Sequence, residues 1–387
     1  MVVAKTQLNI MVSAGEASGD SHASHALQAL ADSGISATSF GMGAGALQDF
    51  GTELIVDCRD LAVIGFVDVL LNYHKFLKRL KLLRQSLKYR KPDLLLLVDY
   101  PDFNLKLAET AKAHGIPVLF YVSPQVWAWR AGRVPRIGSL VSHMAVLFPF
   151  EVDIYEKAGI PVTYVGNPVV HDAVSQYTRV GACEYLGLDQ ERKVIALLPG
   201  SRKGEIKRHL PIMINTIKLL EQKIPGIQFL LPVAPTLDPE FLNQCIGNDM
   251  PASLQLTDKN SRDVMRASDV AFVASGTATL ETALIGTPMV VMYVVNAINY
   301  AIMKRLIRIP DISLVNIVAQ KRIVPEYLQH EAEPSHMADD LTSLLRDKQR
   351  RYQMLADLAV VKEKMGDGGA SKRVANLIRQ LTGTTTH

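Results

Sequence analysis

The chain has 387 residues, which is too long for one ordinary hydrophobic core and favours two domains. Its net charge of +4 is mildly basic and excludes the dominant basic face of a nucleic-acid-binding protein. A hydrophobic fraction of 48% and a charged fraction of 21% are typical of a folded protein. The scattered cysteines Cys58, Cys183 and Cys245 form no CxxC pair and predict no disulfide framework, so we expect a cytoplasmic protein.

The sequence predicts neither a signal peptide nor a membrane-spanning helix. The first residues lead directly into a strand and a glycine loop. No run reaches the roughly 18 apolar residues that a spanning helix requires. The longest candidates are interrupted by Asp68 and by Asn296 and Asn299. We therefore expect a protein that does not cross a membrane but can lie on one.

Short apolar runs alternate with amphipathic stretches through both halves of the chain. Near-continuous apolar strands between helices indicate parallel sheets covered on both faces, so each half is predicted to be a doubly wound, Rossmann-like α/β domain. We expect ligands at the carboxyl ends of the strands. The predicted boundaries are an N-terminal domain over 1–168, a second domain over 169–365, and a last helix and tail over 366–387 that can pack back on the first domain.

The first glycine loop, SAGEASGD, covers residues 13–20 between a strand and a helix. Gly15 and Gly19 permit a tight turn and a close approach of a ligand. The spacing is not that of a dinucleotide fingerprint, and Glu16 and Asp20 would repel a pyrophosphate. The loop, with Ser18, either lines a substrate cleft or only turns the chain.

The stretch VDYPDFN, residues 98–104, ends the buried strand LLLLV. A carboxylate just beyond such a strand is well placed to act as a general base, and we assign that role to Asp99. Asp102 is expected to cap the helix that follows.

Residues 121–137 contain both tryptophans of the chain and three arginines at helical spacing. Trp129 and Arg130 are candidate cleft residues, and Arg130, Arg133 and Arg136 form a row that can meet an anionic ligand. The alternative is a pair of core tryptophans with solvated arginines. His22 and His25 have no third ligand in view, so no metal site is predicted.

Residues 75–91 form a basic stretch without a single acid, and the apolar LAVIGFVDVLL lies just upstream. An apolar body with a cationic face is what binding to an anionic bilayer surface requires. The alternative is an ordinary solvated helix. The predicted membrane-contact residues are Phe66, Val69, Leu70, Phe76, Lys78 and Arg79.

The second half contains two loops suited to phosphate. In LLPGSRKGEI, residues 197–206, a strand meets a turn and then a helix, with Ser201 and Arg202 at the helix start. The same design recurs as Ser275-Gly276-Thr277, one turn before Glu281. Helix N-termini and a planar guanidinium suit diphosphate oxygens.

Glu281 is expected to accept hydrogen bonds from both ribose hydroxyls of a nucleotide. The alternative is that it is only a favourable first-turn acid on the helix dipole. Neither loop has the spacing of a P-loop, so a P-loop kinase or ATPase is not predicted.

Six blocks together resemble the lipid A disaccharide synthase family of Gram-negative bacteria, whose members are inverting glycosyltransferases. They occur in order over nearly the whole chain and are SAGEASGD, VDYPDFN, YVSPQVWAWR, LLPGSRKGEI, ASGTATLETAL and SLVNIVAQKRIVPEYLQ. One departure is Asn167 in VGNPV, where the family pattern has His, so we assign no catalytic role there.

The resemblance implies a GT-B glycosyltransferase fold, in which two such domains face each other across a cleft. The implied donor is UDP-2,3-diacylglucosamine and the implied acceptor 2,3-diacylglucosamine 1-phosphate (lipid X), joined in a β-1′,6 linkage with release of UDP. No cofactor and no metal are implied. Asp99 would be the base, Arg202 the diphosphate clamp, and Glu281 and Asn316 would serve the nucleotide.

The acylated substrates give the basic, apolar segment a purpose, namely peripheral attachment to an anionic surface, the inner face of the inner membrane. The rivals are a UDP-N-acetylglucosamine epimerase, a peptidoglycan glycosyltransferase, and a non-catalytic nucleotide-binding protein at a membrane surface. The sequence leaves a homodimer open.

Overall fold

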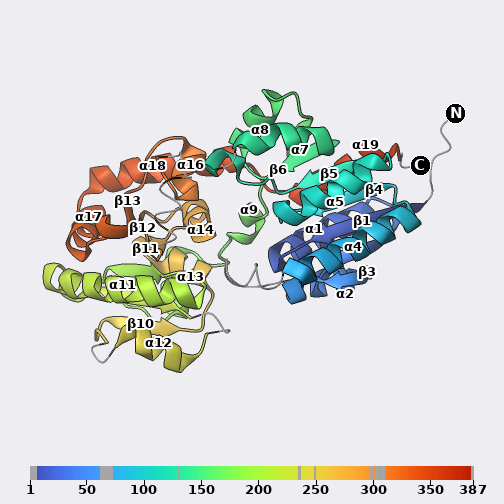
Figure 1. Ribbon diagram of the computed structural model, residues 1–387. Coiled ribbons are helices and arrows are strands. Elements are labelled where there is room, and N and C mark those ends of the chain that lie inside the picture. Colours follow the sequence, from blue (N-terminus) through green and yellow to red (C-terminus); the bar gives the residue numbers. More distant parts are fainter. Residues whose placement is uncertain are drawn as a thin grey trace. The chain divides into compact units, whose positions relative to one another are not determined.

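A computed structural model describes residues 7–61, 73–129, 131–233, 237–247, 250–296 and 310–384, together with Tyr300 and Arg305 (Figure 1). The chain forms two compact units. The first comprises Met1–Pro168 and Gly368–His387, and the second comprises Val169–Asp367. The last helix therefore belongs to the first unit.

The first unit contains a parallel sheet with the strand order β3-β2-β1-β4-β5-β6-β7. Its strands are β1 (Gln7–Ala14), β2 (Ser36–Gly43), β3 (Glu53–Asp57), β4 (Leu94–Val98), β5 (Val118–Tyr121), β6 (His143–Val146) and β7 (Val162–Tyr164). Its helices are α1 (Ala17–Asp32), α2 (Gly45–Phe50), α4 (Tyr73–Arg90), α5 (Pro101–Ala113), α6 (Val126–Trp129), α7 (Val134–Leu140), α8 (Pro149–Glu156) and α19 (Ala370–Thr382).

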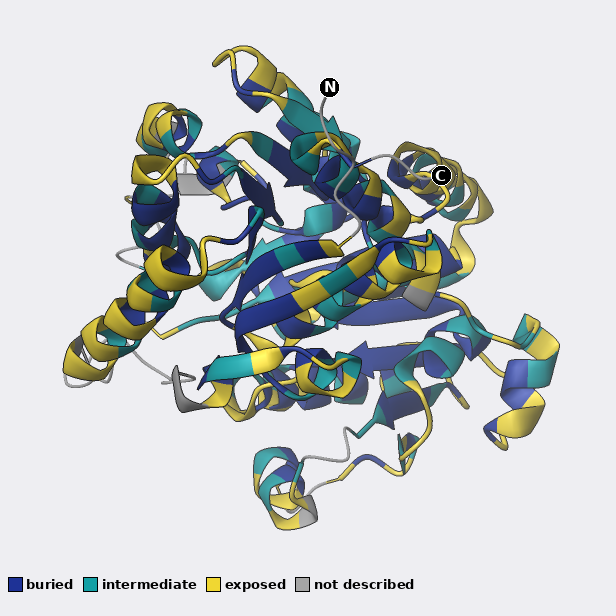
Figure 2. Cartoon of the chain, turned by 90° about the vertical axis from the view of Figure 1, so that its right-hand side faces the viewer, coloured by how far each residue is buried: buried dark blue, intermediate teal, exposed yellow. Residues whose placement is uncertain are grey.

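The sheet of the first unit is buried on both faces, which is why its strands are apolar without alternation. In β4 every residue is 0% exposed. Leu94, Leu96 and Val98 pack with α1 and α19, whereas Leu95 and Leu97 pack with α4, α5 and α7. Burying one such side chain contributes about 1.5–3 kcal/mol. Figure 2 shows the result, with dark blue strands beneath helices whose outer sides are yellow.

The second unit repeats this design with the parallel order β10-β9-β8-β11-β12-β13. Its strands are β8 (Val194–Leu198), β9 (Gln228–Pro232), β10 (Leu254–Thr257), β11 (Val270–Ala274), β12 (Met289–Tyr293) and β13 (Glu326–Leu328). Its helices are α9 (Val169–Asp172), α10 (Arg179–Tyr185), α11 (Lys203–Lys223), α12 (Pro239–Ile246), α13 (Ser261–Ala267), α14 (Thr277–Ile285), α16 (Leu314–Ala319), α17 (Pro334–Arg346) and α18 (Lys348–Met365). The predicted fold class, two doubly wound parallel α/β sheets, is confirmed.

Candidate functional site

In each unit, two of the four motif loops meet at the place where the strand order reverses. In the first unit this is between β1 and β4, where Ala14 pairs with Val98. In the second it is between β8 and β11, where Leu198 pairs with Val273. Doubly wound sheets bind ligands outside the carboxyl ends of the strands at such a point. Residues 13–20 and 98–104 thus share one ligand-binding edge, and residues 199–202 and 275–277 share the other.

Asp99 lies on a strained turn at the carboxyl end of β4. The φ angles of Asp99 and Tyr100 are +49° and +47°, and that of Val122, directly after the neighbouring β5, is +67°. A residue other than glycine with such a φ angle destabilises the fold by about 1–3 kcal/mol, and residues of this kind cluster at functional sites. The surrounding structure must therefore hold this turn in place.

Asn104 supplies that support from the first turn of α5. It is 0% exposed, and its Nδ2 donates to the carbonyl oxygen of Asp99 (2.6 Å) and to that of Ser13 (3.2 Å). The Ser13 hydroxyl in turn donates to Asn104 Oδ1 (2.6 Å). These bonds tie the ends of β1 and β4 together and fix the direction of the Asp99 side chain. No role for Asn104 was predicted from its place in VDYPDFN.

The surroundings of Asp99 favour its protonated form. Burial first, and the charge of Glu16 second, raise the pKa of Asp99 to about 6, although the N–H of Tyr100 opposes the shift. A carboxyl group with this pKa is ionised at pH 7.5 and is a stronger proton acceptor than an ordinary aspartate. Asp99 is therefore suited to remove a proton from a hydroxyl group.

Replacing Glu16 with Gln is expected to shift the acid limb of the pH–rate profile to lower pH. The change removes a negative charge that raises the pKa of Asp99, so Asp99 stays ionised, and active as a base, in more acidic solution. The measurement is kcat/KM between pH 5 and 8 for both proteins. An acid limb that stays in place would show that Asp99 does not govern it.

The rest of the SAGEASGD loop has structural duties. A Cβ on Gly15 would lie 2.3 Å from the ring of Tyr100, so only glycine lets this ring pack there. Asp20 is 3% exposed and accepts from the N–H groups of Ala44 (2.6 Å) and Ala46 (2.8 Å) at the start of α2. Asp20 is thus a helix cap, whereas the exposed Glu16 lies near Asp99.

The two described arginines of the predicted row, Arg133 and Arg136, are both paired with acids. Arg133 pairs with Asp102 (2.6 Å) and Arg136 with Glu109 (2.6 Å). This corrects the expected role of Asp102, which lies in the first turn of α5 but is not its N-cap; the N-cap is Tyr100. Arg130 and the side chain of Trp129 lie outside the described residues.

A hollow of about 240 Å³ opens beside Asp99. Its walls come from the carboxyl ends of β4, β5 and β6: Asp99, Pro101, Val122, Ser123, Pro124, Gln125, Leu147, Phe148 and Glu151. Glu151 is a functional candidate that the sequence analysis missed. The available signal was an acid shortly after the apolar strand HMAVLFP, which is the pattern that identified Asp99.

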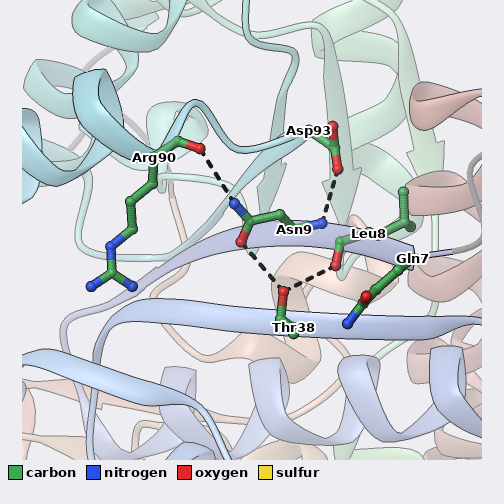
Figure 3. A pocket seen from close by; sticks show the side chains of 6 residues that line it. All are labelled: Gln7, Leu8, Asn9, Thr38, Arg90 and Asp93. Carbon is green, nitrogen blue, oxygen red and sulfur yellow. Dashed lines mark hydrogen bonds between the residues drawn. The ribbon is translucent and has the colours of Figure 1, made fainter.

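A second, larger hollow lies at the opposite edge of this sheet, around the amino ends of β1 and β2 (Figure 3). There the Asn9 N–H donates to Asp93 (2.9 Å) and the Thr38 hydroxyl to the carbonyl oxygen of Leu8 (3.3 Å). These polar groups are hydrogen-bonded to one another, and they lie at the edge of the sheet away from the motif loops. We therefore assign no function to this hollow.

In the second unit, Arg202 immediately precedes α11 and its side chain is 80% exposed. One of its Nη atoms lies 3.0 Å from Glu205, whose other oxygen accepts from the Arg202 N–H (3.3 Å). Gly200 has a φ of +108°, and a Cβ there would lie 2.5 Å from Glu205. The loop can therefore close over Glu205 only with glycine at this position.

His209 holds the same loop from inside the unit. It is 0% exposed, its Nδ1 lies 2.8 Å from the carbonyl oxygen of Pro199, and its Nε2 accepts from the N–H of Val294 (3.0 Å). Burial lowers the pKa of His209, which keeps the ring neutral. His209 thus joins the loops after β8 and β12, a role without a signal in the sequence.

The loop after β11 offers backbone donors at the start of α14. Gly276 and Thr277 are exposed, and the first N–H groups of a helix have no partner within the helix. Ser275 is held differently, because its N–H and hydroxyl donate to the carbonyl oxygens of Met292 (2.9 Å) and Ile312 (3.1 Å). The exposed backbone donors of this loop are therefore at Gly276 and Thr277, and Ser275 fixes the loop.

Glu281 and Asn316 differ in their access to a ligand. The Glu281 side chain is 20% exposed, with Arg262 at 3.9 Å. Asn316 is 1% exposed. Its Nδ2 donates to the carbonyl oxygen of Val324 and to Glu326, and its Oδ1 accepts from the N–H of Ile323. The expectation that Asn316 contacts the nucleotide is corrected, because its hydrogen-bonding positions are used within the chain. It acts indirectly.

The indirect route from Asn316 runs through a buried carboxylate. Asn316 Nδ2 donates to Glu326 (2.9 Å), which also accepts from the N–H of Ser313 (3.1 Å). The adjoining Ile312 donates its N–H to Glu326 and accepts the Ser275 hydroxyl. Asn316 is therefore connected to the loop at Ser275 through hydrogen bonds of Glu326 and Ile312.

Helix α4 carries the basic stretch. Leu80, Leu83 and Leu87 are buried against the core, so most of its apolar stripe serves packing inside the unit. Leu77 and Leu82 are 44% and 40% exposed beside exposed lysines. Phe66, Val69 and Leu70 lie outside the described residues. In the described parts of the chain, no helix combines the length and hydropathy that crossing a bilayer demands.

Among the residues that the structure describes, no cluster of three or more His, Cys, Asp or Glu side chains is suited to a metal ion.

The paired parallel sheets, each with its motif loops at the reversal of strand order, define the chain as a GT-B-type protein. Solved structures agree. MurG from Acinetobacter baumannii matches with a TM-score of 0.59 at 16% identity, over 97% of this chain and 100% of that chain. UDP-GlcNAc 2-epimerase from Neisseria meningitidis, bound to UDP-GlcNAc, matches with a TM-score of 0.61 at 15% identity, over 97% and 99%.

The sequence is more specific. The chain belongs to the lipid-A-disaccharide synthetase family, whose profile matches residues 10–377. Lipid-A-disaccharide synthase of Geobacter sulfurreducens is 42% identical over 381 residues, 98% of each chain. That of Myxococcus xanthus is 42% identical over 372 residues, 96% of this chain and 97% of the other. These similarities make the chain a glycosyltransferase of this family. They do not favour the rival classes, because the epimerase and MurG structures share only the fold with this chain.

Proposed function

We propose that this protein transfers 2,3-diacylglucosamine from UDP-2,3-diacylglucosamine to 2,3-diacylglucosamine 1-phosphate. The products are the β-1′,6-linked lipid A disaccharide 1-phosphate and UDP. Family membership supports the substrates. The observation that carries the mechanism is the partly buried Asp99, with a pKa of about 6, on a strained turn at the ligand-binding edge of its sheet.

In this mechanism Asp99 removes the proton from the acceptor 6-hydroxyl as the oxygen attacks the anomeric carbon of the donor. The bond to UDP breaks on the opposite face of the sugar, so a single displacement inverts the configuration. Negative charge grows on the departing diphosphate. Arg202 and the N–H groups of Gly276 and Thr277 stabilise that charge, and one preorganised donor of this kind contributes roughly 3–4 kcal/mol.

The test is a reaction of the purified protein with both lipid substrates in detergent, with EDTA present, in which UDP and the tetra-acyl disaccharide phosphate are measured. Equal amounts of both products are expected. Binding of the UDP-sugar without formation of a disaccharide would leave the fold assignment intact and exclude this acceptor.

Helix α4 is our candidate for attachment to the inner face of the inner membrane. Its exposed Lys75, Lys78 and Lys81 stand beside the exposed Leu77 and Leu82, and lysines near an anionic surface contribute about 1 kcal/mol each. Attachment by this helix keeps the protein peripheral and its binding sensitive to salt.

Changing Lys75, Lys78 and Lys81 together to Glu is expected to weaken binding to anionic vesicles at least about 100-fold, because the change removes three favourable charges of about 1 kcal/mol each. Co-sedimentation with vesicles containing phosphatidylglycerol, at low and high salt, measures this. The matched control carries the same change at Lys207, Lys348 and Lys362, exposed lysines of the second unit. Equal losses in both variants would show a net-charge effect and contradict the role of α4.

A further inference from the structure

We propose that the hollow beside Asp99 holds the sugar ring of the acceptor and that Glu151 binds that ring, accepting a hydrogen bond from a hydroxyl or amide group. The inference rests on the proposed function and identifies the subsite at which the acceptor is held. The ligand class is a single hexosamine ring, whose 6-hydroxyl meets Asp99.

The size and lining of the hollow fit one sugar ring. Its volume of about 240 Å³ is below the roughly 300–1,000 Å³ of pockets that enclose a drug-sized ligand, so a whole diacylated sugar does not fit inside. Asp99 borders the hollow, as do Ser123 and Glu151. Phe148 and Leu147 add apolar surface for the C–H groups of a pyranose. This combination of a few polar groups with apolar walls is typical of a small-molecule site.

Glu151 is an unusual helix cap, because it is only 2% exposed. Its Oε1 accepts from the indole N–H of Trp127 (3.2 Å), and its Oε2 accepts from the N–H of Phe148 (3.1 Å). The Ser123 side chain and the Leu147 backbone contribute hydrogen bonds as well. Because Glu151 also lines the hollow, its carboxylate is the acceptor that a ring hydroxyl or amide group meets there.

The protonation of Glu151 makes this contact sensitive to pH. Burial raises the pKa of Glu151 to about 7, against the opposing hydrogen bonds from Phe148, Trp127 and Ser123. The ionised form accepts hydrogen bonds at both oxygens, so acceptor binding should strengthen as the pH rises through 7. Asp99, with its pKa of about 6, ionises at lower pH, so the two carboxyl groups are distinguishable.

The experiment compares kinetics for acceptor and donor in the full-length protein. With Glu151→Gln, the KM for 2,3-diacylglucosamine 1-phosphate should rise at least about tenfold, because a hydrogen bond to a charged group is lost. The KM for the UDP-sugar and the affinity for UDP should stay unchanged. The ionisation near pH 7 in kcat/KM for the acceptor should disappear, an effect that a purely structural role of Glu151 does not produce.

Two further variants separate binding from folding. Gln125 is an exposed residue that lines the hollow, so Gln125→Trp should block the acceptor without disturbing the core. Tyr155→Phe removes only the 2.7 Å contact of the buried Tyr155 with Ser123 and serves as the packing control, with both KM values expected to stay the same.

The outcomes distinguish this inference from the proposed function. An unchanged KM for the acceptor in Glu151→Gln or Gln125→Trp, or equal rises for donor and acceptor, would overturn the subsite while the wild type still forms disaccharide. A wild-type protein that forms no disaccharide would overturn the proposed function and the subsite with it.

Discussion

Replacing Asp99 with Asn is expected to abolish nearly all transfer activity while the protein stays folded. The amide cannot accept the proton of the acceptor hydroxyl, and loss of a general base typically costs about 10²–10⁴ in rate. Asn is also one of the few residues that tolerates the φ of +49° at this position. The measurement is kcat from UDP release, together with the thermal midpoint of both proteins.

The thermal midpoint of the Asp99→Asn protein should be unchanged or higher at pH 8. The folded state raises the pKa of Asp99 from 3.8 to about 6, so folding favours the protonated form and stability is lost as the pH rises through this range. At pH 8 the wild type therefore contains a partly buried charge that opposes folding, and Asn removes it. A stability gain with an activity loss marks a functional group rather than a packing group.

Asp102 is the matched control for Asp99. It lies three residues away on the same motif, but its side chain is 68% exposed and pairs with Arg133. An exposed ion pair contributes little to stability, so Asp102→Asn should leave both rate and midpoint near those of the wild type. If the two variants were equally impaired, general loss of charge near the turn, rather than loss of the base, would be responsible.

The fold was predictable from the sequence because apolar runs of strand length alternate with amphipathic stretches. The run LLLLV alone indicates a strand buried on both faces, and β4 is such a strand. The motif loops were predictable for a related reason, since glycines and polar residues directly after a strand lie at the carboxyl edge of a parallel sheet. The strand order, which makes the loops neighbours in pairs, needed the structure.

The parts of the site that escaped prediction depend on contacts between distant segments. Asn104, which supports Asp99, is itself held by Ser13, 91 residues away in the chain. His209 joins loops that are separated by the length of several elements, and Glu151 enters the hollow only because β6 lies beside β5. Asn316 illustrates the opposite error, because a polar residue in a motif block was expected at the ligand and is buried instead.

Replacing Arg202 with Ala is expected to lower kcat by about 10²–10³, which is the typical cost of removing one preorganised donor from a developing negative charge. The guanidinium stands at the start of α11, where the helix dipole also favours an anion. Kinetics with both substrates saturating measure the effect on the transfer step. The thermal midpoint should change little, since the side chain is 80% exposed.

Two comparisons give the Arg202 experiment its meaning. Arg202→Lys retains the charge but not the planar fork, so an activity between those of Ala and wild type is expected if the fork binds two diphosphate oxygens. Lys223→Ala removes one positive charge from the other end of α11, where Lys223 pairs with Asp339, and should leave the rate unchanged. Full activity in Arg202→Ala would remove Arg202 from the mechanism. The growing charge on UDP would then be stabilised by the N–H groups at Gly276 and Thr277 alone. Substitutions that block the N-terminus of α14 would then be the test of how the diphosphate is stabilised.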